Sequence, residues 1–240
     1  MYTRSAEFYD ALYAFKDYAK EAHLLIDLVR QRRPDAASLL DVACGTGKHL
    51  EVFRDCFRVE GLDNNPAFRA RAERRCGVPV HQVDMRTFDL GRRFDVVTCL
   101  FSAVGNLLDA ADLQRALTTM AAHVTANGLV IVEPWFTPET YWVDRVTVNL
   151  MDTAAYKGAW MYVSRREDCR SVLDIQYLVA GPDGIDNFSE RHELGLFTTG
   201  QMVAAFRGAG LSVDHDPVGI SGRGLYVGTP AGDRATATPR

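Results

Sequence analysis

The chain has 240 residues, of which 47% are hydrophobic and 24% charged, and its formal net charge is −4. This composition is typical of a globular protein, and we expect one domain spanning residues 1–240. A negative net charge excludes a nucleic-acid binder that depends on a basic surface, and no apolar run approaches the roughly 18 residues of a membrane span. The five cysteines lack C-x-x-C spacing. We therefore expect a cytoplasmic protein with reduced thiols, no metal site, and neither nucleic acid nor a membrane as partner.

Strand and helix patterns alternate over the first part of the chain. Helices are expected at 5–32, 48–57, 66–76 and 112–124, and strands at 37–43, 58–63, 78–83, 94–101 and 129–133. A helix at 199–209 and strands at 211–216 and 225–228, on either side of a turn at 219–224, follow later. These lengths predict an α/β fold with a mostly parallel seven-stranded sheet and helices on both faces.

Residues 141–197 interrupt this alternation. Strands with mixed faces are expected at 160–166, 171–180 and 188–197, with a turn at 181–184. We interpret the segment as an antiparallel β insertion over the catalytic edge of the sheet, where it would contribute to the acceptor site. The last ten residues are expected to form a frayed tail.

Suitable ligand-binding groups follow four of the predicted strands, and open parallel sheets bind ligands at the carboxyl ends of their strands. The glycines at 45 and 47 let the backbone approach a ligand closely. Asp63 can accept two hydrogen bonds from a ribose diol. Residues 84–85 offer a carboxylate for an adenine amino group and a methionine for its ring, and residues 100–102 face the same pocket.

A dinucleotide site uses the same glycine loop and is the natural alternative. Its fingerprint has a third glycine three residues after the second, where this chain has Leu50. A sulfonium nucleoside has no pyrophosphate and needs no third glycine. The acids at 63 and 84 therefore favour S-adenosylmethionine over a dinucleotide, and over an ordinary strand-to-helix turn.

Several segments carry a family resemblance. LLDVACGTGKHL at 39–50, VEGLD at 59–63 and DMRTF at 84–88 resemble the nucleoside-binding motifs of the Rossmann-like class I S-adenosylmethionine-dependent methyltransferases. A narrower resemblance, to the N,N-dimethyltransferases of TDP-linked 3-amino deoxysugars in antibiotic biosynthesis (desosamine and mycaminose), is carried by KDYAKEA at 16–22, CLFSAVGNL at 99–107, VEPWFTPET at 132–140, YLVAGPDGI at 177–185 and SGRGLYVG at 221–228. It runs almost end to end. It implies S-adenosylmethionine as donor, a TDP-linked amino deoxysugar as acceptor and a homodimer.

The implied reaction is an in-line displacement by a neutral amine on the sulfonium methyl group. Positioning can supply as much as roughly 7–11 kcal/mol of its barrier. The cofactor-binding residues expected are Tyr18, Asp41, Ala43, Gly45, Gly47, Asp63, Asn64, Asp84, Met85, Leu100, Phe101 and Ser102. The acceptor-binding residues expected are Tyr2, Tyr13, Lys16, Asn106, Trp135, Arg166 and Arg223, of which Tyr13 and Asn106 would orient the amine in catalysis. Arg223 suits a phosphate because a guanidinium binds it in a bidentate way.

Three departures from the family pattern concern the site. The second strand ends in Asp63-Asn64-Asn65, where relatives often have Glu-Leu-Ser. Asn106 stands where relatives have His or Tyr, and the glycine-rich segment before Lys16 is shortened to Ala14-Phe15; both lie where the sugar is expected. His123 is expected to cap a helix rather than react. Two alternatives stay open: a methyltransferase for another small amine or hydroxyl, and a nucleoside-binding protein without turnover.

Overall fold

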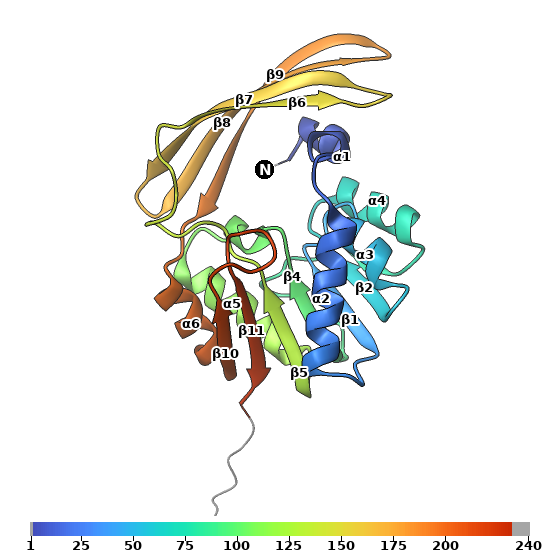
Figure 1. The fold of residues 1–240 in the computed structure, drawn as a ribbon, viewed down its shortest axis with the longest axis vertical. Helices are drawn as coiled ribbons and strands as arrows, with labels where there is room; N and C mark the ends of the chain where they lie inside the picture. Colours follow the sequence, from blue (N-terminus) through green and yellow to red (C-terminus); the bar gives the residue numbers. More distant parts are fainter. Residues whose placement is uncertain (1, 232–240) are drawn as a thin grey trace, which may run out of the picture.

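The computed structural model describes residues 2–231, so the tail predicted at the end of the chain lies outside the described residues except for residue 231. Its central sheet has seven strands in the order β10-β11-β5-β4-β1-β2-β3 (Figure 1). The parallel strands are β1 (Ser38–Val42), β2 (Arg58–Leu62), β3 (Val80–His81), β4 (Phe94–Cys99) and β5 (Val124–Val132). The hairpin of β10 (Leu211–Asp216) and β11 (Leu225–Pro230) joins the edge with β11 antiparallel to β5. The predicted mostly parallel seven-stranded sheet is confirmed.

Helices cover both faces of this sheet, as predicted. The helices are α2 (Tyr18–Arg32), α3 (Lys48–Phe53), α4 (Pro66–Cys76), α5 (Ala110–Ala122) and α6 (Thr199–Gly208). Successive strand side chains point to opposite faces, so Leu39 and Val96 pack with α2 and α3, whereas Leu40 and Val97 pack with α5 and α6. The carboxyl ends of β1, β2 and β4 are thereby fixed between two apolar layers.

A second sheet forms from the chain between β5 and α6. It has four antiparallel strands, β6 (Val146–Asp152), β7 (Lys157–Glu167), β8 (Arg170–Gly181) and β9 (Gly184–Gly195). In Figure 1 it arches over the carboxyl edge of the central sheet. The insertion therefore contains four strands rather than the three predicted. In the additional strand, β6, the apolar Val146, Val148 and Leu150 are exposed and the polar Thr147 and Asn149 face inward, the reverse of the pattern usual for a half-buried strand.

The predicted helix at 5–32 is wrong. A 3₁₀ turn, η1 (Arg4–Phe8), leads into the short α1 (Tyr9–Leu12), and α2 begins only at Tyr18. Asp17 separates α1 from α2, because its carboxylate caps the start of α2 by accepting from the Lys20 amide at 2.9 Å. The break turns residues 2–13 away from the helix axis toward the second sheet, where Glu190 accepts from the amides of Thr3 and Ser5, each at 3.0 Å.

Other boundaries shift by a few residues. The strand predicted at 94–101 ends at Cys99, because Phe101 and Ser102 have φ of 49° and 60° and leave the extended conformation. The helix predicted at 112–124 spans 110–122 and is followed by His123, whose Nε2 accepts from the Leu90 amide at 3.0 Å and whose Nδ1 bonds the Thr119 carbonyl at 2.8 Å. Within residues 2–231, no helix combines the length and apolarity needed to cross a membrane.

Candidate functional site

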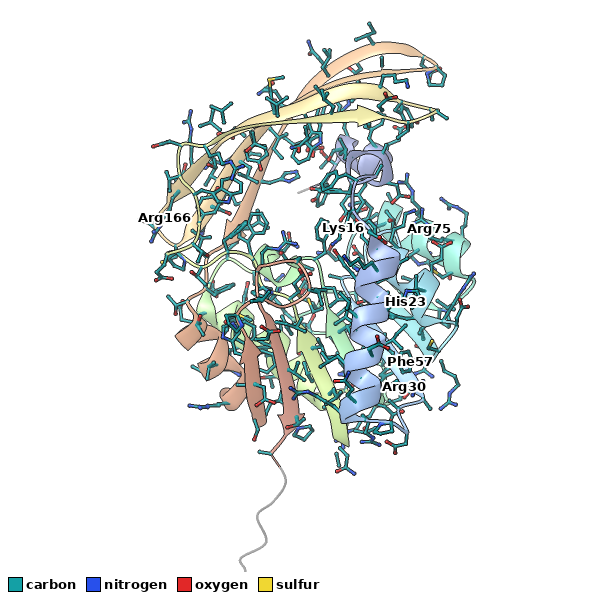
Figure 2. The ribbon with its side chains drawn as sticks, viewed as in Figure 1. Lys16, His23, Arg30, Phe57, Arg75 and Arg166 are labelled. Carbon is teal, nitrogen blue, oxygen red and sulfur yellow. The ribbon has the colours of Figure 1, made fainter. Side chains whose placement is uncertain are left out.

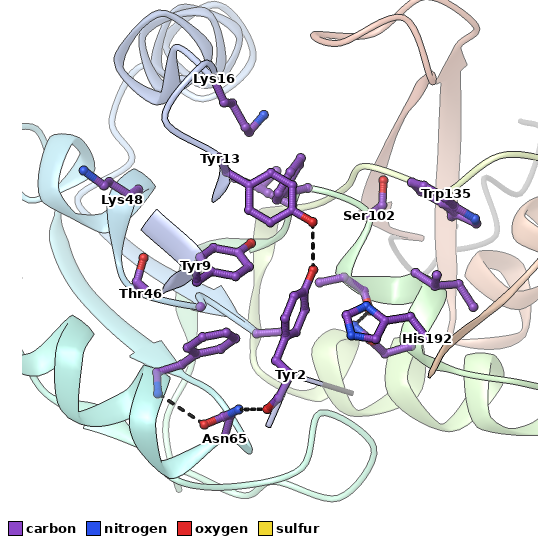
Figure 3. Close-up of a pocket in the computed structure, with 18 of the residues that line it drawn as sticks. Tyr2, Tyr9, Tyr13, Lys16, Thr46, Lys48, Asn65, Ser102, Trp135 and His192 are labelled. Carbon is purple, nitrogen blue, oxygen red and sulfur yellow. Dashed lines mark hydrogen bonds between the residues drawn. The ribbon is translucent and has the colours of Figure 1, made fainter. Parts of the chain in front are cut away.

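A cavity of about 980 Å³ lies between the carboxyl edge of the central sheet, the N-terminal segment and the inner face of the second sheet (Figure 3). This volume suits a small-molecule site. It brings together most of the residues expected from the sequence: Tyr2, Tyr13, Lys16, Tyr18, Asp41, Ala43, Gly45, Asp63, Asn64, Met85, Leu100, Phe101, Ser102, Asn106, Trp135 and Arg223.

Three expected site residues lie outside the cavity wall. Gly47, with φ 81°, caps α3, and an added Cβ there would meet α4 at 3.0 Å, so a glycine is needed here for close packing. The Asp84 carboxylate is occupied by Arg86, accepting from its Nε at 2.9 Å and its Nη2 at 2.6 Å. Arg166 bonds the Asp168 carbonyl at 2.9 Å, and Figure 2 shows it at the end of the second sheet far from Lys16. The ligand-binding roles of these three stay predictions.

Asp63 locks the loop that follows β1. Its Oδ2 accepts from the Gly45 amide at 2.9 Å and its Oδ1 from the Asn65 amide at 2.8 Å. Gly45 has φ 58° and no atom within 4 Å of a would-be Cβ, so its backbone is open to a ligand. Burial raises the pKa of Asp63, although the two backbone hydrogen bonds oppose this. Each carboxylate oxygen keeps a free lone pair beside the cavity.

Asp41 is the second acid at this edge. It lies on β1, only 2% exposed, and accepts from the Thr98 hydroxyl at 2.7 Å. Burial raises its pKa to about 6, while His49 and the Thr98 hydrogen bond act to lower it. The cavity therefore has two buried carboxyl groups on one side, an arrangement that suits a cationic ligand.

A buried ionic cluster beside Phe101 was not predicted as a unit. The Lys16 ammonium pairs with Glu21, whose other oxygen lies 3.0 Å from His49 Nε2. Burial alone would raise the pKa of Glu21, but hydrogen bonds from His49 and Lys16 lower it. Lys16 Nζ also lies 4.3 Å from the Phe101 ring centroid. Lys16 was expected from the sequence, but Glu21 and His49 lie 5 and 33 residues after it. Only the packing of α2 on α3 brings His49 close to Glu21.

Aromatic side chains of the N-terminal segment form another wall. The hydroxyl groups of Tyr2 and Tyr13 lie 3.1 Å apart, and the Asn65 amide donates to the Tyr2 carbonyl at 3.0 Å (Figure 3). The Tyr2 ring meets His192 of β9 edge-on at 4.7 Å. Burial raises the pKa of both tyrosines above 10. Their hydroxyl groups are therefore neutral donors and acceptors, not tyrosinate bases.

Asn106, Trp135 and Arg223 lie at the opposite wall. The Asn106 amide nitrogen donates to the Ala103 carbonyl at 2.8 Å, leaving Oδ1 as an acceptor. The Trp135 indole donates to the Ser171 hydroxyl at 2.9 Å. The Arg223 guanidinium lies 5.8 Å from the Trp135 ring centroid, and its Nε is buried without a hydrogen-bond partner among the described residues. An orphaned donor of this kind is satisfied by a ligand or water.

The second sheet adds inner-face residues that were missed from the sequence. Strand pairing sets Thr147 opposite Tyr162 and Asn149 opposite Trp160, and all four line the cavity with Arg145. The Trp160 indole nitrogen and the Thr147 hydroxyl are buried and have no hydrogen-bond partner within residues 2–231. The alternation of polar and apolar residues at 146–150 was the one local signal for this face.

Comparisons with known proteins agree with this geometry. Residues 39–128 match the family model described as a methyltransferase domain. The chain is 46% identical to dTDP-3-amino-3,6-dideoxy-alpha-D-glucopyranose N,N-dimethyltransferase from Streptomyces fradiae, over 94% of this chain and 90% of the relative. It is 42% identical to dTDP-3-amino-3,4,6-trideoxy-alpha-D-glucopyranose N,N-dimethyltransferase from Streptomyces venezuelae, over 94% of this chain and 98% of the relative.

Solved structures share the whole architecture, including the second sheet. The crystal structure of DesVI from Streptomyces venezuelae matches with a TM-score of 0.91 at 41% identity, over 96% of this chain and 100% of that one. The S-adenosylmethionine-bound structure of CalS10, an amino pentose methyltransferase from Micromonospora echinaspora, matches with a TM-score of 0.85 at 39% identity. The match covers 95% of this chain and 97% of CalS10. The similarity therefore extends through both walls of the cavity.

Proposed function

Because the chain belongs to the S-adenosylmethionine-dependent N,N-dimethyltransferases of dTDP-linked amino sugars, we propose that its cavity holds S-adenosylmethionine and a dTDP-linked amino deoxysugar together. The class I fold, the methyltransferase activity and the S-adenosylmethionine cofactor predicted from the sequence are confirmed. The observation that carries the acceptor class is the 46% identity over 94% of the chain, which includes the insertion. This favours a nucleotide sugar over the two open alternatives, another small acceptor and a protein without turnover.

The donor site is assigned to the edge formed by β1, β2 and β4. Asp63 would hold the ribose diol through its free lone pairs, and Met85 and Leu100 would pack on adenine. Asp41 would face the cationic end, since a buried carboxylate favours positive charge. When bound, the cofactor supplies an electrophilic methyl group that a free amine takes directly. The open backbone at Gly45 and the two buried acids fit this group.

The acceptor site is assigned to the wall that carries Asn106, Trp135 and Arg223, together with Tyr13 of the N-terminal segment. Arg223 would bind the diphosphate, and Trp135 would flank the sugar. Tyr13 and Asn106 would each accept a hydrogen bond from the amine, which fixes its lone pair toward the methyl group. Neither is a strong base, so the amine must lose its proton before each transfer.

Mass spectrometry of a reaction mixture tests the assignment. The protein is incubated with S-adenosylmethionine and, in separate samples, dTDP-linked 3-amino and 4-amino deoxysugars. We expect two added methyl groups on a 3-amino sugar. Thermal protection by S-adenosylhomocysteine but not by dTDP, with no methylated sugar, would contradict the acceptor assignment and leave the donor site intact.

Cofactor affinity should depend on pH through Asp41. Its folded pKa of about 6 exceeds the ordinary 3.8, so the carboxyl is largely protonated below about pH 6. The cationic cofactor binds the ionised form, and its affinity should fall by up to about tenfold per pH unit below that value. Isothermal calorimetry from pH 5 to pH 8 measures this dependence. Asp41→Asn should bind weakly at every pH with a flatter profile; an unchanged profile would contradict the assignment.

We propose a cytoplasmic homodimer in which the outer face of the second sheet meets its copy. Val146, Val148 and Leu150 of the edge strand β6 are 70%, 56% and 77% exposed, and Met161, Val163 and Leu178 extend this apolar face. An exposed apolar face of this kind favours packing against an identical face across a twofold axis. Each copy would be one methyltransferase domain, residues 1–240, with the insertion at 141–197.

Measuring the oligomeric state of variants tests this interface. Val148→Lys should convert the dimer to a monomer in analytical ultracentrifugation, because each lysine would place a charge within the apolar interface. Lys20→Ala, an exposed change on α2, serves as the control. A wild-type monomer, or a dimer that survives the Val148 change, would contradict this interface.

A further inference from the structure

Glu133 is a buried carboxylate that does not line the cavity. It follows β5 directly, and its amide continues the parallel pairing by donating to the Cys99 carbonyl at 2.9 Å. Its exposed fraction is 0%. A charged side chain this deeply buried is costly unless all its acceptor sites are used.

The carboxylate bonds two separate loops at once. Oε2 accepts from the Phe101 amide at 2.6 Å, on the loop after β4. Oε1 accepts from the Ser221 hydroxyl and faces Arg223 Nη2 at 3.4 Å, both on the loop between β10 and β11. Glu133 therefore ties the residue proposed to bind diphosphate to the turn between the donor and acceptor walls.

That turn needs external support. Phe101 and Ser102 both have positive φ, which is uncommon for non-glycine residues and persists only where surrounding contacts enforce it. The Phe101 amide is held by Glu133, and the Ser102 hydroxyl donates to the Pro134 carbonyl at 2.8 Å. The turn leads directly into η2 (Ala103–Asn106), which presents Asn106 to the cavity.

The Phe101 ring lies at the junction of the two walls. Tyr13 meets it edge-on at 5.2 Å, and the guanidinium of Arg223 lies 5.5 Å from its centroid. Lys16 Nζ lies 4.3 Å from the same centroid. A displacement of this turn would move groups on both sides, whereas loss of the Arg223 contact alone would affect only the acceptor side.

We propose that Glu133 is a positioning residue for acceptor binding, which acts by fixing the Arg223 guanidinium and the Phe101–Ser102 turn. This inference rests on the proposed function, because it assumes that Arg223 binds the diphosphate. The carboxylate restrains Arg223 Nη2 and leaves Nε without a partner among the described residues. The guanidinium is therefore held in one orientation before the ligand binds. Such preorganisation lowers the ordering cost of binding.

Glu133→Gln separates the two contacts. The retained carbonyl oxygen can still accept from the Phe101 amide, and the new amide group can donate to Ser221. That amide group faces another donor at Arg223, so this one contact is lost. We expect the KM for the dTDP-amino sugar to rise about 10- to 100-fold, with kcat and the Kd of S-adenosylhomocysteine changed less than about threefold.

Glu60→Gln is the matched control. Glu60 is also a buried carboxylate on the central sheet, bonded to His81 at 2.8 Å and paired with Arg92, away from the cavity. It should lower the melting temperature without changing the KM. If Glu133→Gln lowers the melting temperature in the same way and leaves the KM unchanged, its role is structural and the inference is overturned.

A double-mutant cycle tests whether the effect passes through Arg223. In an Arg223→Ala background, Glu133→Gln should raise the KM for the dTDP-amino sugar by less than about a further threefold, because the contact is already absent. A full additional loss would overturn the inference. If Glu133→Gln does not fold, Ser221→Ala replaces it, with an expected severalfold rise in KM; an unchanged KM would overturn the inference.

Calorimetry of the wild-type protein with dTDP distinguishes a failure of the Glu133 role from a failure of the proposed acceptor class. If the wild-type protein does not bind dTDP, the proposed acceptor class fails. If it binds dTDP and Glu133→Gln binds equally well, only the role of Glu133 fails.

Discussion

Replacing Arg223 with alanine is expected to abolish the protection that dTDP gives the protein against heat, and to raise the KM for the nucleotide sugar about 100-fold. The Arg223 side chain is largely buried, 16% exposed, with its Nε unpartnered among the described residues. Charge-assisted hydrogen bonds to a phosphate in such a place contribute about 1.5–3 kcal/mol each. Differential scanning fluorimetry with dTDP and steady-state kinetics measure the two effects, while binding of S-adenosylhomocysteine should persist.

Arg166→Ala is the control for this change. Arg166 was also expected at the acceptor site, but it bonds backbone carbonyl groups at the end of the second sheet. We expect its removal to leave both dTDP protection and KM unchanged. The opposite result, in which Arg166→Ala loses dTDP protection and Arg223→Ala keeps it, would place the diphosphate site at the outer part of the insertion.

Replacing Asp63 with alanine should weaken S-adenosylhomocysteine binding by at least about 100-fold. The change removes the proposed partner of the ribose diol, and it also releases the amides of Gly45 and Asn65 that shape the loop. Two hydrogen bonds to a charged group correspond to about 3–6 kcal/mol together. Isothermal calorimetry gives the Kd, and binding of dTDP serves as the internal reference.

Asp95→Ala provides the matched comparison at the opposite end of β1. The Asp95 carboxylate accepts from the amides of Ala37 and Ser38 at 2.9 and 3.0 Å, much as Asp63 holds its own loop. This variant should be less stable, because two backbone donors lose their partner, yet it should bind S-adenosylhomocysteine normally. Equal losses of affinity in both variants would mean that Asp63 acts through stability alone.

The donor side of the cavity was largely predictable because its determinants are local. Asp41, Gly45 and Asp63 lie on or directly after strands that their own apolar runs reveal, and parallel strands bring their carboxyl ends together. The exception is Asp84, whose carboxylate turns to Arg86 only two residues away. A neighbouring arginine in the same turn was the signal that this acid had a local partner.

The acceptor side depends on contacts between distant segments, which periodicity does not encode. Tyr2 meets His192 across 190 residues, and Thr147 faces the cavity only because of the register between β6 and β7. The helix predicted at 5–32 failed for the same reason. Its pattern was compatible with a helix, but Glu190 and Asp17 offer the backbone better partners in a bent path.

The path of the N-terminal segment bears on how the protein should be prepared. Tyr2 lines the cavity and is fastened by Asn65 and Tyr13, so any fusion peptide joined ahead of it would emerge beside the ligands (Figure 3). Strand β11, by contrast, runs antiparallel to β5 and ends at Pro230 on the opposite edge of the sheet. Affinity tags and surface-immobilisation linkers therefore belong after β11, and activity lost in amino-terminally tagged preparations would reflect obstruction of the cavity.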